Sequence, residues 1–251
     1  MLSITEENYL KALFKLTSSS LEKSNAGTNE MATHLNVKPA TVNDMLKKLK
    51  EKNLINYEKY KKITFTPEGK KLALEVLRKH RLWETFLYEK LQFSWDEVHE
   101  VAEQLEHIQS ERLVNKLDEF LGFPTEDPHG DAIPDIHGNM KTIEKQLLSD
   151  GIISQKYICV GVKDTSSEFL KYLDKQEIAL GSKIEFLSKE SFDLSVKIKI
   201  DNSSSEEELK NIYSTYPQFA KEIYPLIVSK QSALTALNAQ MISEKSVIRM
   251  F

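Results

Sequence analysis

Residues 28–66 decide the predicted fold of this 251-residue chain, and they read TNEMATHLNVKPATVNDMLKKLKEKNLINYEKYKKITFT. Two short runs have the apolar spacing of helices, and a turn at 36–38 separates them. Pro39 stands at the start of the second run, where the first turn of a helix tolerates proline. Two alternating segments around a basic tip then predict a β-hairpin. This order predicts a winged helix-turn-helix, in which the second helix enters the major groove of DNA.

The charge of the chain is unevenly distributed. Residues 1–72 contain 13 lysines, no arginine and 8 acidic residues, a net charge of +5, whereas the whole chain carries −4. A basic block on an acidic remainder predicts a local face for a polyanion. Thr41 and Asn43 can reach base edges, and the lysines can neutralise phosphates. The predicted DNA-contacting residues are Lys38, Pro39, Ala40, Thr41, Asn43, Lys47, Lys48, Lys59, Lys61 and Lys62. A winged helix that binds another protein is the alternative.

Helical and strand-like patterns flank this unit. The helices expected from apolar spacing span 4–17, about 70–91, about 94–121 and 166–173. The strands expected from alternation span 157–162, 183–187, 194–200 and 247–251. A connection rich in Pro, Gly and Asp occupies 122–138, and the polar run 202–208 introduces an expected helix that ends near Tyr224. No internal repeat is evident.

A possible metal centre lies on the two long helices. His99, Glu103, Glu106 and His107 are spaced so that all four project from one helix face. His80 and Glu84, four residues apart, share a face of the preceding helix. Imidazole and carboxylate ligands without thiolate suit octahedral Mn²⁺ or Fe²⁺ better than a closed tetrahedral zinc site, although Zn²⁺ can occupy such a site in vitro. An ordinary charged helix face is the alternative.

Several motifs together resemble the diphtheria-toxin-repressor family of iron- and manganese-dependent transcriptional repressors. The motifs that carry the resemblance are Tyr9-Leu10, the helix-turn-helix, Thr66-Pro-Glu-Gly69, Arg78-Lys-His80-Arg-Leu-Trp-Glu84, Glu103-Gln-Leu-Glu106-His107, Pro124 and Pro128-His-Gly-Asp-Ala-Ile-Pro134. They cover about residues 1–140. The resemblance implies a homodimer that binds a palindromic operator when Mn²⁺ or Fe²⁺ is bound and that represses metal-uptake genes.

The resemblance also implies two sets of metal ligands. One set is Glu103, Glu106 and His107 with a first-helix ligand at Asn8. The other set is His80, Glu84 and His99, to which Glu168 adds an extra ligand. The family has aspartate or methionine at Asn8, manganese-type members have glutamate at Lys11, and iron-type members usually have cysteine at Glu103. Lysine cannot ligate a metal while protonated, so Asn8 or a water is the predicted ligand from the first helix.

The predicted fold class is mainly α with small β parts, in three domains. Residues 1–72 form the winged helix-turn-helix, 73–140 a helical dimerisation and metal-binding domain, and 141–251 a small SH3-like barrel with an insertion near 202–226. The single cysteine, Cys159, excludes an intramolecular disulfide and is expected to be buried in a strand. Without a signal-peptide or membrane pattern, the expected location is the cytoplasm.

An enzyme is the weaker interpretation. A di-iron oxidase needs two Glu-x-x-His motifs on helices, and the one occurrence, Glu126–His129, is interrupted by Pro128. A zinc protease needs His-Glu-x-x-His, and the segment at His99 lacks the second histidine. A winged-helix regulator that senses no metal remains a third possibility. His129 and His137, in the connection, are assigned no role.

Overall fold

The structure is a computed structural model that describes residues 2–18, 27–58, 62–141, 145–191 and 195–201, and the backbone of three short strands beyond them. The chain forms two compact units. The first comprises 1–83, 100–125 and 133–140, and the second comprises 84–99, 126–132 and 141–251. The helices are α1 (Ile4–Ser18), α2 (Thr28–His34), α3 (Pro39–Glu51), α4 (Pro67–Leu91), α5 (Val98–Leu105), α6 (Glu111–Phe120) and α7 (Ser167–Lys175), with a 3-10 turn at Leu148–Asp150. The strands are β1 (Ile55–Asn56), β2 (Thr64–Phe65), β3 (Lys156–Gly161), β4 (Lys183–Lys189), β5 (Val196–Asp201), β6 (Asn211–Ile212), β7 (Leu226–Lys230) and β8 (Ser246–Met250).

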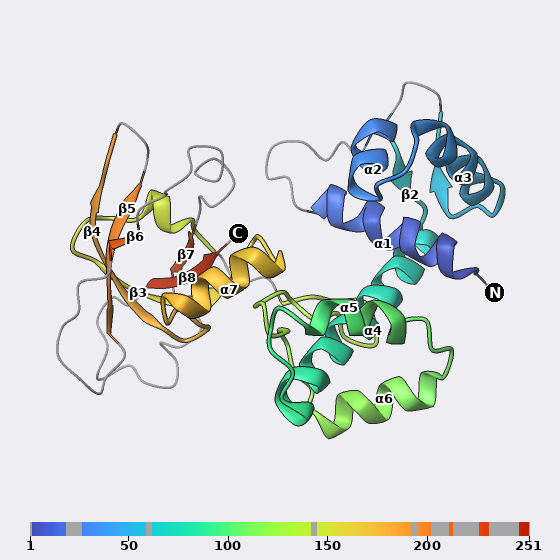
Figure 1. The fold of residues 1–251 in the computed structure, drawn as a ribbon. Coiled ribbons are helices and arrows are strands. Elements are labelled where there is room, and N and C mark those ends of the chain that lie inside the picture. Colours follow the sequence, from blue (N-terminus) through green and yellow to red (C-terminus); the bar gives the residue numbers. More distant parts are fainter. Residues whose placement is uncertain are drawn as a thin grey trace. The chain divides into compact units, whose positions relative to one another are not determined.

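The predicted order of helix, turn, helix and hairpin is confirmed in the first unit (Figure 1). Pro39 begins α3, and Asn36 takes a positive φ of 51° in the turn before it. The hairpin strands β1 and β2 pair antiparallel, with Ile55 opposite Phe65. The hairpin residues Lys59 and Lys61, predicted to contact DNA, lie outside the described residues.

The core of the first unit follows from helical periodicity. Leucines three or four residues apart on α1 and α3 point inward, and hydrophobic residues of α2, the hairpin and α4 close around them. The side chains with no exposed surface in this core are Leu10, Leu13, Met31, Val42, Leu46, Leu49, Ala73 and Leu77. Burial of such a set is the main favourable term that holds the small helices together.

The single helix expected over 94–121 is wrong, because the chain forms two helices there. The first, α5, ends at Leu105, and the second, α6, begins at Glu111. Ser110 caps α6 by accepting a hydrogen bond from the Leu113 amide, which favours a new helix start over continuation. A buried ion pair of 2.6 Å between Arg78 of α4 and Asp118 then ties α6 to α4.

The second unit contains a six-stranded sheet in the order β6-β5-β4-β3-β8-β7. Its strands pair antiparallel except for β3 and β8, which run parallel. Cys159 of β3 is completely buried as expected, and burial raises the pKa of its thiol to about 12. Within the expected helix that ends near Tyr224, residues 211–212 form strand β6 instead, and the rest of 202–225 lies outside the described residues.

The C-terminal sheet keeps two edge strands, β6 and β7, in the part of the chain that the structure describes. Closure into an SH3-like barrel therefore stays a prediction. Among the described residues, no helix has both the length and the apolar character that crossing a bilayer requires.

Gly69 provides a test of the packing between the hairpin and α4. A Cβ atom at Gly69 would lie 1.8 Å from the backbone oxygen of Leu54, so the backbone must shift to accept it. We expect Gly69→Ala to lower the free energy of unfolding by about 1–3 kcal/mol, the usual cost of overpacking. Urea denaturation measures this, with Lys70→Ala at the exposed neighbouring position as control. Equal midpoints for the two variants would contradict the close approach.

Candidate metal centre

A cluster of charged side chains joins α1 to the end of α5 in the first unit. The ammonium nitrogen of Lys11 lies 2.6 Å from Glu103 Oε1 and 2.7 Å from Glu106 Oε2. Lys11 is 5% exposed and Glu106 is 0% exposed, so this contact is sealed from solvent on the Glu106 side. Glu106 Oε2 also lies 2.6 Å from His80 Nδ1 on α4. One buried carboxylate oxygen thus serves both a lysine and a histidine.

Glu7, which the sequence analysis missed, belongs to the same cluster. Its Oε2 atom lies 2.6 Å from His107 Nδ1, and its Oε1 atom accepts a 2.9 Å hydrogen bond from the Gln109 side chain. The nearby Asn8 Oδ1 and Glu106 Oε1 are buried and accept no hydrogen bond from any described residue. The signal for Glu7 was its position directly before Asn8 on the first helix.

The second unit contains a different group of ligand-type side chains, Glu84, Asp127 and His129. Each of the three offers one ligand atom, these atoms lie within 4.8 Å of one another, and all three side chains are buried. Glu84 comes from α4, and the other two come from the connection before β3. A set of two carboxylates and one imidazole has the oxygen and nitrogen donors that Mn²⁺ and Fe²⁺ accept.

A tight turn holds Asp127 and His129 in place. Asp127 Oδ1 accepts hydrogen bonds of 2.8 Å from the backbone amides of His129 and Asp131, so the turn uses one carboxylate oxygen. Gly130 has a φ of +82°, and a Cβ atom there would lie 1.9 Å from the Val160 backbone oxygen. Only glycine fits this position. The His129 backbone oxygen accepts the Val162 amide at 2.9 Å, which anchors the turn at the end of β3.

The hydrogen bonding of His129 leaves one of its ring nitrogens without a hydrogen. Its Nε2 atom lies 2.7 Å from the backbone oxygen of Trp95. A carbonyl oxygen can only accept, so Nε2 carries the hydrogen, and in the neutral ring Nδ1 keeps its lone pair. Nδ1 lies 3.9 Å from Glu84 Oε1. A backbone acceptor that fixes the tautomer of a histidine in this way is the usual arrangement around metal-binding histidines.

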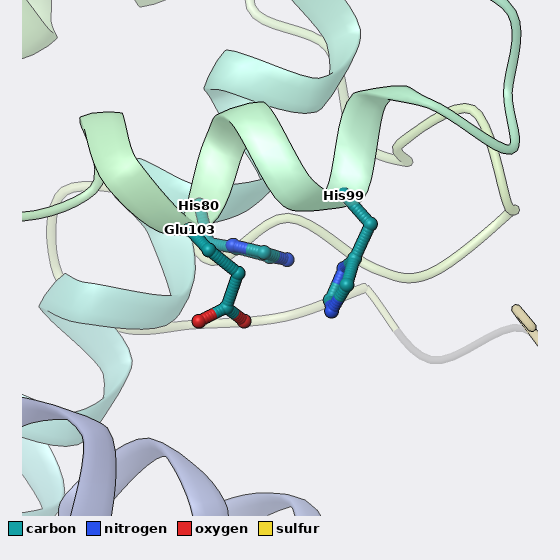
Figure 2. Close-up of side chains that lie close together, drawn as sticks. All are labelled: His80, His99 and Glu103. Carbon is teal, nitrogen blue, oxygen red and sulfur yellow. The ribbon is translucent and has the colours of Figure 1, made fainter.

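Figure 2 shows another group, formed by His80 on α4 and by His99 and Glu103 on α5. The ligand atoms of these three also lie within 4.8 Å of one another. His99 Nδ1 lies 3.0 Å from Glu84 Oε1. The predicted ligand set of His80, Glu84 and His99 is thus divided between the two three-residue groups, although Glu84 and His99 stay in contact.

The remaining predicted ligands take other positions. Glu106 and His107 belong to neither three-residue group among the described residues, and they contact Lys11 and Glu7 instead. Glu168, in the first turn of α7, is exposed and also belongs to neither group. A role for these residues in metal binding stays a prediction.

The sequence analysis gave His129 no role, but a short repeat in the sequence marks the turn that holds it. Residues 127–131 and 135–139 both follow the pattern Asp-x-His-Gly-Asp/Asn, and both fold into the same turn. Asp135 Oδ1 accepts the amides of His137 and Asn139 at 2.8 Å, and Gly138 has a φ of +80°. The first copy is largely buried and faces Glu84, whereas Asp135 and His137 in the second copy are exposed.

Most of the described residues predicted to contact DNA are exposed. Those at the start and along the outer face of α3 and beside the hairpin are Lys38, Pro39, Ala40, Thr41, Lys47, Lys48 and Lys62. Asn43 differs, because it is half-buried and its Oδ1 atom accepts hydrogen bonds from Tyr57 at 2.7 Å and Thr28 at 3.3 Å. The carbonyl oxygen of Asn43 thus braces α3 against α2 and the hairpin.

Two family models match this chain. The "Iron dependent repressor, N-terminal DNA binding domain" matches residues 1–63, and the "Iron dependent repressor, metal binding and dimerisation domain" matches residues 66–135. The chain belongs to the iron-dependent repressor family. The second match spans His80, Glu84, Asp127 and His129, so the buried group lies in the part of this family that is described as binding metal.

Individual members of the iron-dependent repressor family are also similar to this chain in sequence. The "Iron-dependent repressor IdeR" of Mycobacterium tuberculosis (strain ATCC 25618 / H37Rv) is 31% identical over 130 residues, which are 52% of this chain and 55% of the relative. The chain thus spans about half the length of the curated relatives that it matches.

Solved structures extend the similarity over more of the chain. A "Manganese-dependent transcriptional repressor complex with manganese" is 30% identical with a TM-score of 0.76, and the match covers 89% of this chain and 99% of that chain. The structure of "ScaR with bound Zn2+" is 31% identical with a TM-score of 0.66, over 82% of this chain and 94% of that chain.

The turn at Asp127 allows a matched pair of variants. Asp127→Asn keeps the oxygen that holds the turn and replaces the other oxygen by an amide, which removes a candidate ligand and keeps the turn. We expect this variant to bind Mn²⁺ about tenfold or more weakly, as losses around metal sites usually do. Titration calorimetry measures the affinity. Asp135→Asn, in the exposed copy of the turn, should bind like the wild type, and equal affinities for all three proteins would remove Asp127 from the site.

Proposed function

We propose that this protein is a metal-dependent transcriptional repressor that binds DNA as a homodimer and is activated by Mn²⁺ or Fe²⁺. The observation that carries the proposal is the buried group of Glu84, Asp127 and His129 in a chain that also has a winged helix-turn-helix. Membership in the iron-dependent repressor family supports it, because the matching domains are described by DNA binding, metal binding and dimerisation. The proposed location is the cytoplasm, and we propose no enzymatic activity.

The DNA-binding part of the proposal rests on α3. Exposed Lys38, Lys47 and Lys48 supply positive charge at one side of this helix, and Thr41 supplies a hydroxyl that can reach a base edge. A dimer would present two such helices, and a palindromic operator with two half-sites would match them. The genes under control, by the same reasoning from the family, are those of metal uptake.

The metal-binding part of the proposal assigns the ion to Glu84, Asp127 and His129. A bound cation supplies positive charge between two buried carboxylates, which otherwise repel each other. Ligation by His129 needs its neutral form with the lone pair on Nδ1, which the bond to Trp95 already selects. Relatives are named for iron and for manganese, and one solved relative holds zinc, so Zn²⁺ is expected to bind in vitro. His80, His99 and Glu103 are a second proposed group, and Glu168 is a further proposed ligand. The family resemblance also implies Glu106, His107 and Asn8 as ligands, but Glu106 is paired with Lys11 and His107 with Glu7.

Some parts of the proposal concern the domain plan. The winged helix-turn-helix is proposed to end near residue 72 and the helical domain near residue 140. The C-terminal sheet is proposed to belong to a small SH3-like domain with an insertion near 202–226. Limited proteolysis followed by mass spectrometry of the fragments tests these boundaries.

The first test of the function is the metal requirement of DNA binding. Duplexes enriched from a random pool by the Mn²⁺-loaded protein serve as the probe, and fluorescence anisotropy measures the affinity. We expect the affinity to fall by at least about tenfold when a chelator replaces Mn²⁺, and Fe²⁺ under anaerobic conditions to restore it, since a coupling of a few kcal/mol is typical of such effectors. Equal affinity in chelator, with metal removal verified by elemental analysis, would refute metal activation.

The second test concerns the phosphate contacts proposed for α3. The logarithm of DNA affinity falls linearly with the logarithm of salt concentration, by about 0.9 for each neutralised phosphate. We therefore expect Lys48→Ala to weaken binding and to reduce this slope by about one unit per lost contact in each subunit. Lys175→Ala, at an exposed position of α7, is the control and should leave the slope unchanged. An unchanged slope in Lys48→Ala would show that Lys48 does not contact a phosphate.

A further inference from the structure

We propose that the Lys11 ammonium replaces a metal ion between Glu103 and Glu106, so that α1 is tied to α5 by an internal cation and needs no bound metal there. This inference rests on the proposed function, since it concerns which of the candidate groups responds to metal. The proposal assigns Lys11 a role as an internal cation that the family resemblance does not imply, because manganese-type relatives have a glutamate at this position.

Lys11 contacts one oxygen of each carboxylate. Its nitrogen lies 2.6 Å from Glu103 Oε1 and 2.7 Å from Glu106 Oε2, which are the distances of short charge-assisted hydrogen bonds. Two carboxylates brought together, of which Glu106 is completely buried and Glu103 half-buried, need positive charge between them. Because Glu106 is completely buried, protein groups and not bulk water supply the compensation: the Lys11 ammonium, with His80 Nδ1 2.6 Å from the same oxygen.

Lys11 also makes the same place unfavourable for a metal ion. A protonated lysine has no lone pair to donate, and its charge repels a second cation. His107, the third predicted ligand, lies with Nδ1 2.6 Å from Glu7 and with Nε2 3.6 Å from Glu106 Oε1. Glu103, Glu106 and His107 therefore do not fit a metal ion while Lys11 stays in position.

The two buried acceptors that Lys11 leaves unused indicate what its removal would create. Asn8 Oδ1 and Glu106 Oε1 accept no hydrogen bond from any described residue. Without the ammonium, these oxygens and the two released carboxylate oxygens form a set of hard donors that a divalent ion prefers. Loss of Lys11 is thus expected to convert an internal ion pair into a metal site.

The experiment compares Lys11→Met with the wild type, using Mn²⁺ alone as the probe. Equilibrium dialysis with elemental analysis measures the number of ions bound per chain, and calorimetry measures the melting temperature. We expect Lys11→Met to bind one more Mn²⁺ per chain than the wild type. In chelator it should melt several degrees lower, and Mn²⁺ should raise its melting temperature by more than that of the wild type. The control is Lys71→Met, which removes an exposed lysine 3.9 Å from Glu75 and should change neither quantity.

Two more variants keep the proposal open to refutation if Lys11→Met does not fold. Lys11→Arg retains a cation and should bind as many ions as the wild type, so an additional ion in this variant would overturn the proposal. Glu106→Gln keeps the shape of the side chain, and loss of a Mn²⁺ ion that the wild type binds would show that Glu106 ligates metal there. If Lys11→Met folds and binds the same number of ions as the wild type, the proposal for Lys11 is also overturned.

The outcome is separable from that of the proposed function. In the double variant Lys11→Met with Asp127→Asn, the additional ion should persist although the ion assigned to Asp127 is weakened. If wild-type protein binds no Mn²⁺ at all, the proposed function fails, whereas an ion gained on removal of Lys11 still supports the role of the ammonium.

Discussion

The helical part of this protein depends on how it compensates buried negative charge. Six carboxylates are buried among the described residues: Glu6, Glu7, Glu84, Glu106, Asp118 and Asp127. An unpaired charge in such a place costs more than a typical domain can tolerate, so each one must be met by a cation or by hydrogen bonds. The positions of these partners therefore dictate which helices must lie together.

Three of these carboxylates are met by lysine or arginine from a distant part of the chain. Lys52, at the end of α3, lies 2.7 Å from Glu6 of α1, while Lys11 and Arg78 meet Glu106 and Asp118. Burial alone would raise the pKa of Glu6, but hydrogen bonds from Lys52 and Ser3 outweigh it and hold the pKa below its ordinary value. Glu84 and Asp127 are met differently, by histidine and by backbone amides.

The sequence predicted much of the fold and only part of the candidate site. Within residues 28–66, Pro39 marks a helix start and the alternating pattern marks the hairpin, so the winged helix could be inferred from local patterns. The break between α5 and α6 depends on the Ser110 cap, which competes with an otherwise continuous helical pattern. Apolar periodicity alone does not take such a capping hydrogen bond into account. Helix periodicity could not indicate that His129 lies beside Glu84, because a turn and not a helix places this histidine. Lys11 was visible as a departure from the family, but its two partners became known only when α1 was placed beside α5.

For the metal site proposed at Glu84, Asp127 and His129, the turn at Asp127 has a consequence for the kinetics of metal exchange. Its hydrogen bonds form within five residues of the chain, so the conformational entropy of ordering Asp127 and His129 is lost during folding and not at the moment an ion arrives. Binding of an ion at this turn therefore needs no separate step in which the loop becomes ordered. When the concentration of free metal falls, the bound ion can dissociate, and the donor atoms keep the same arrangement for rebinding.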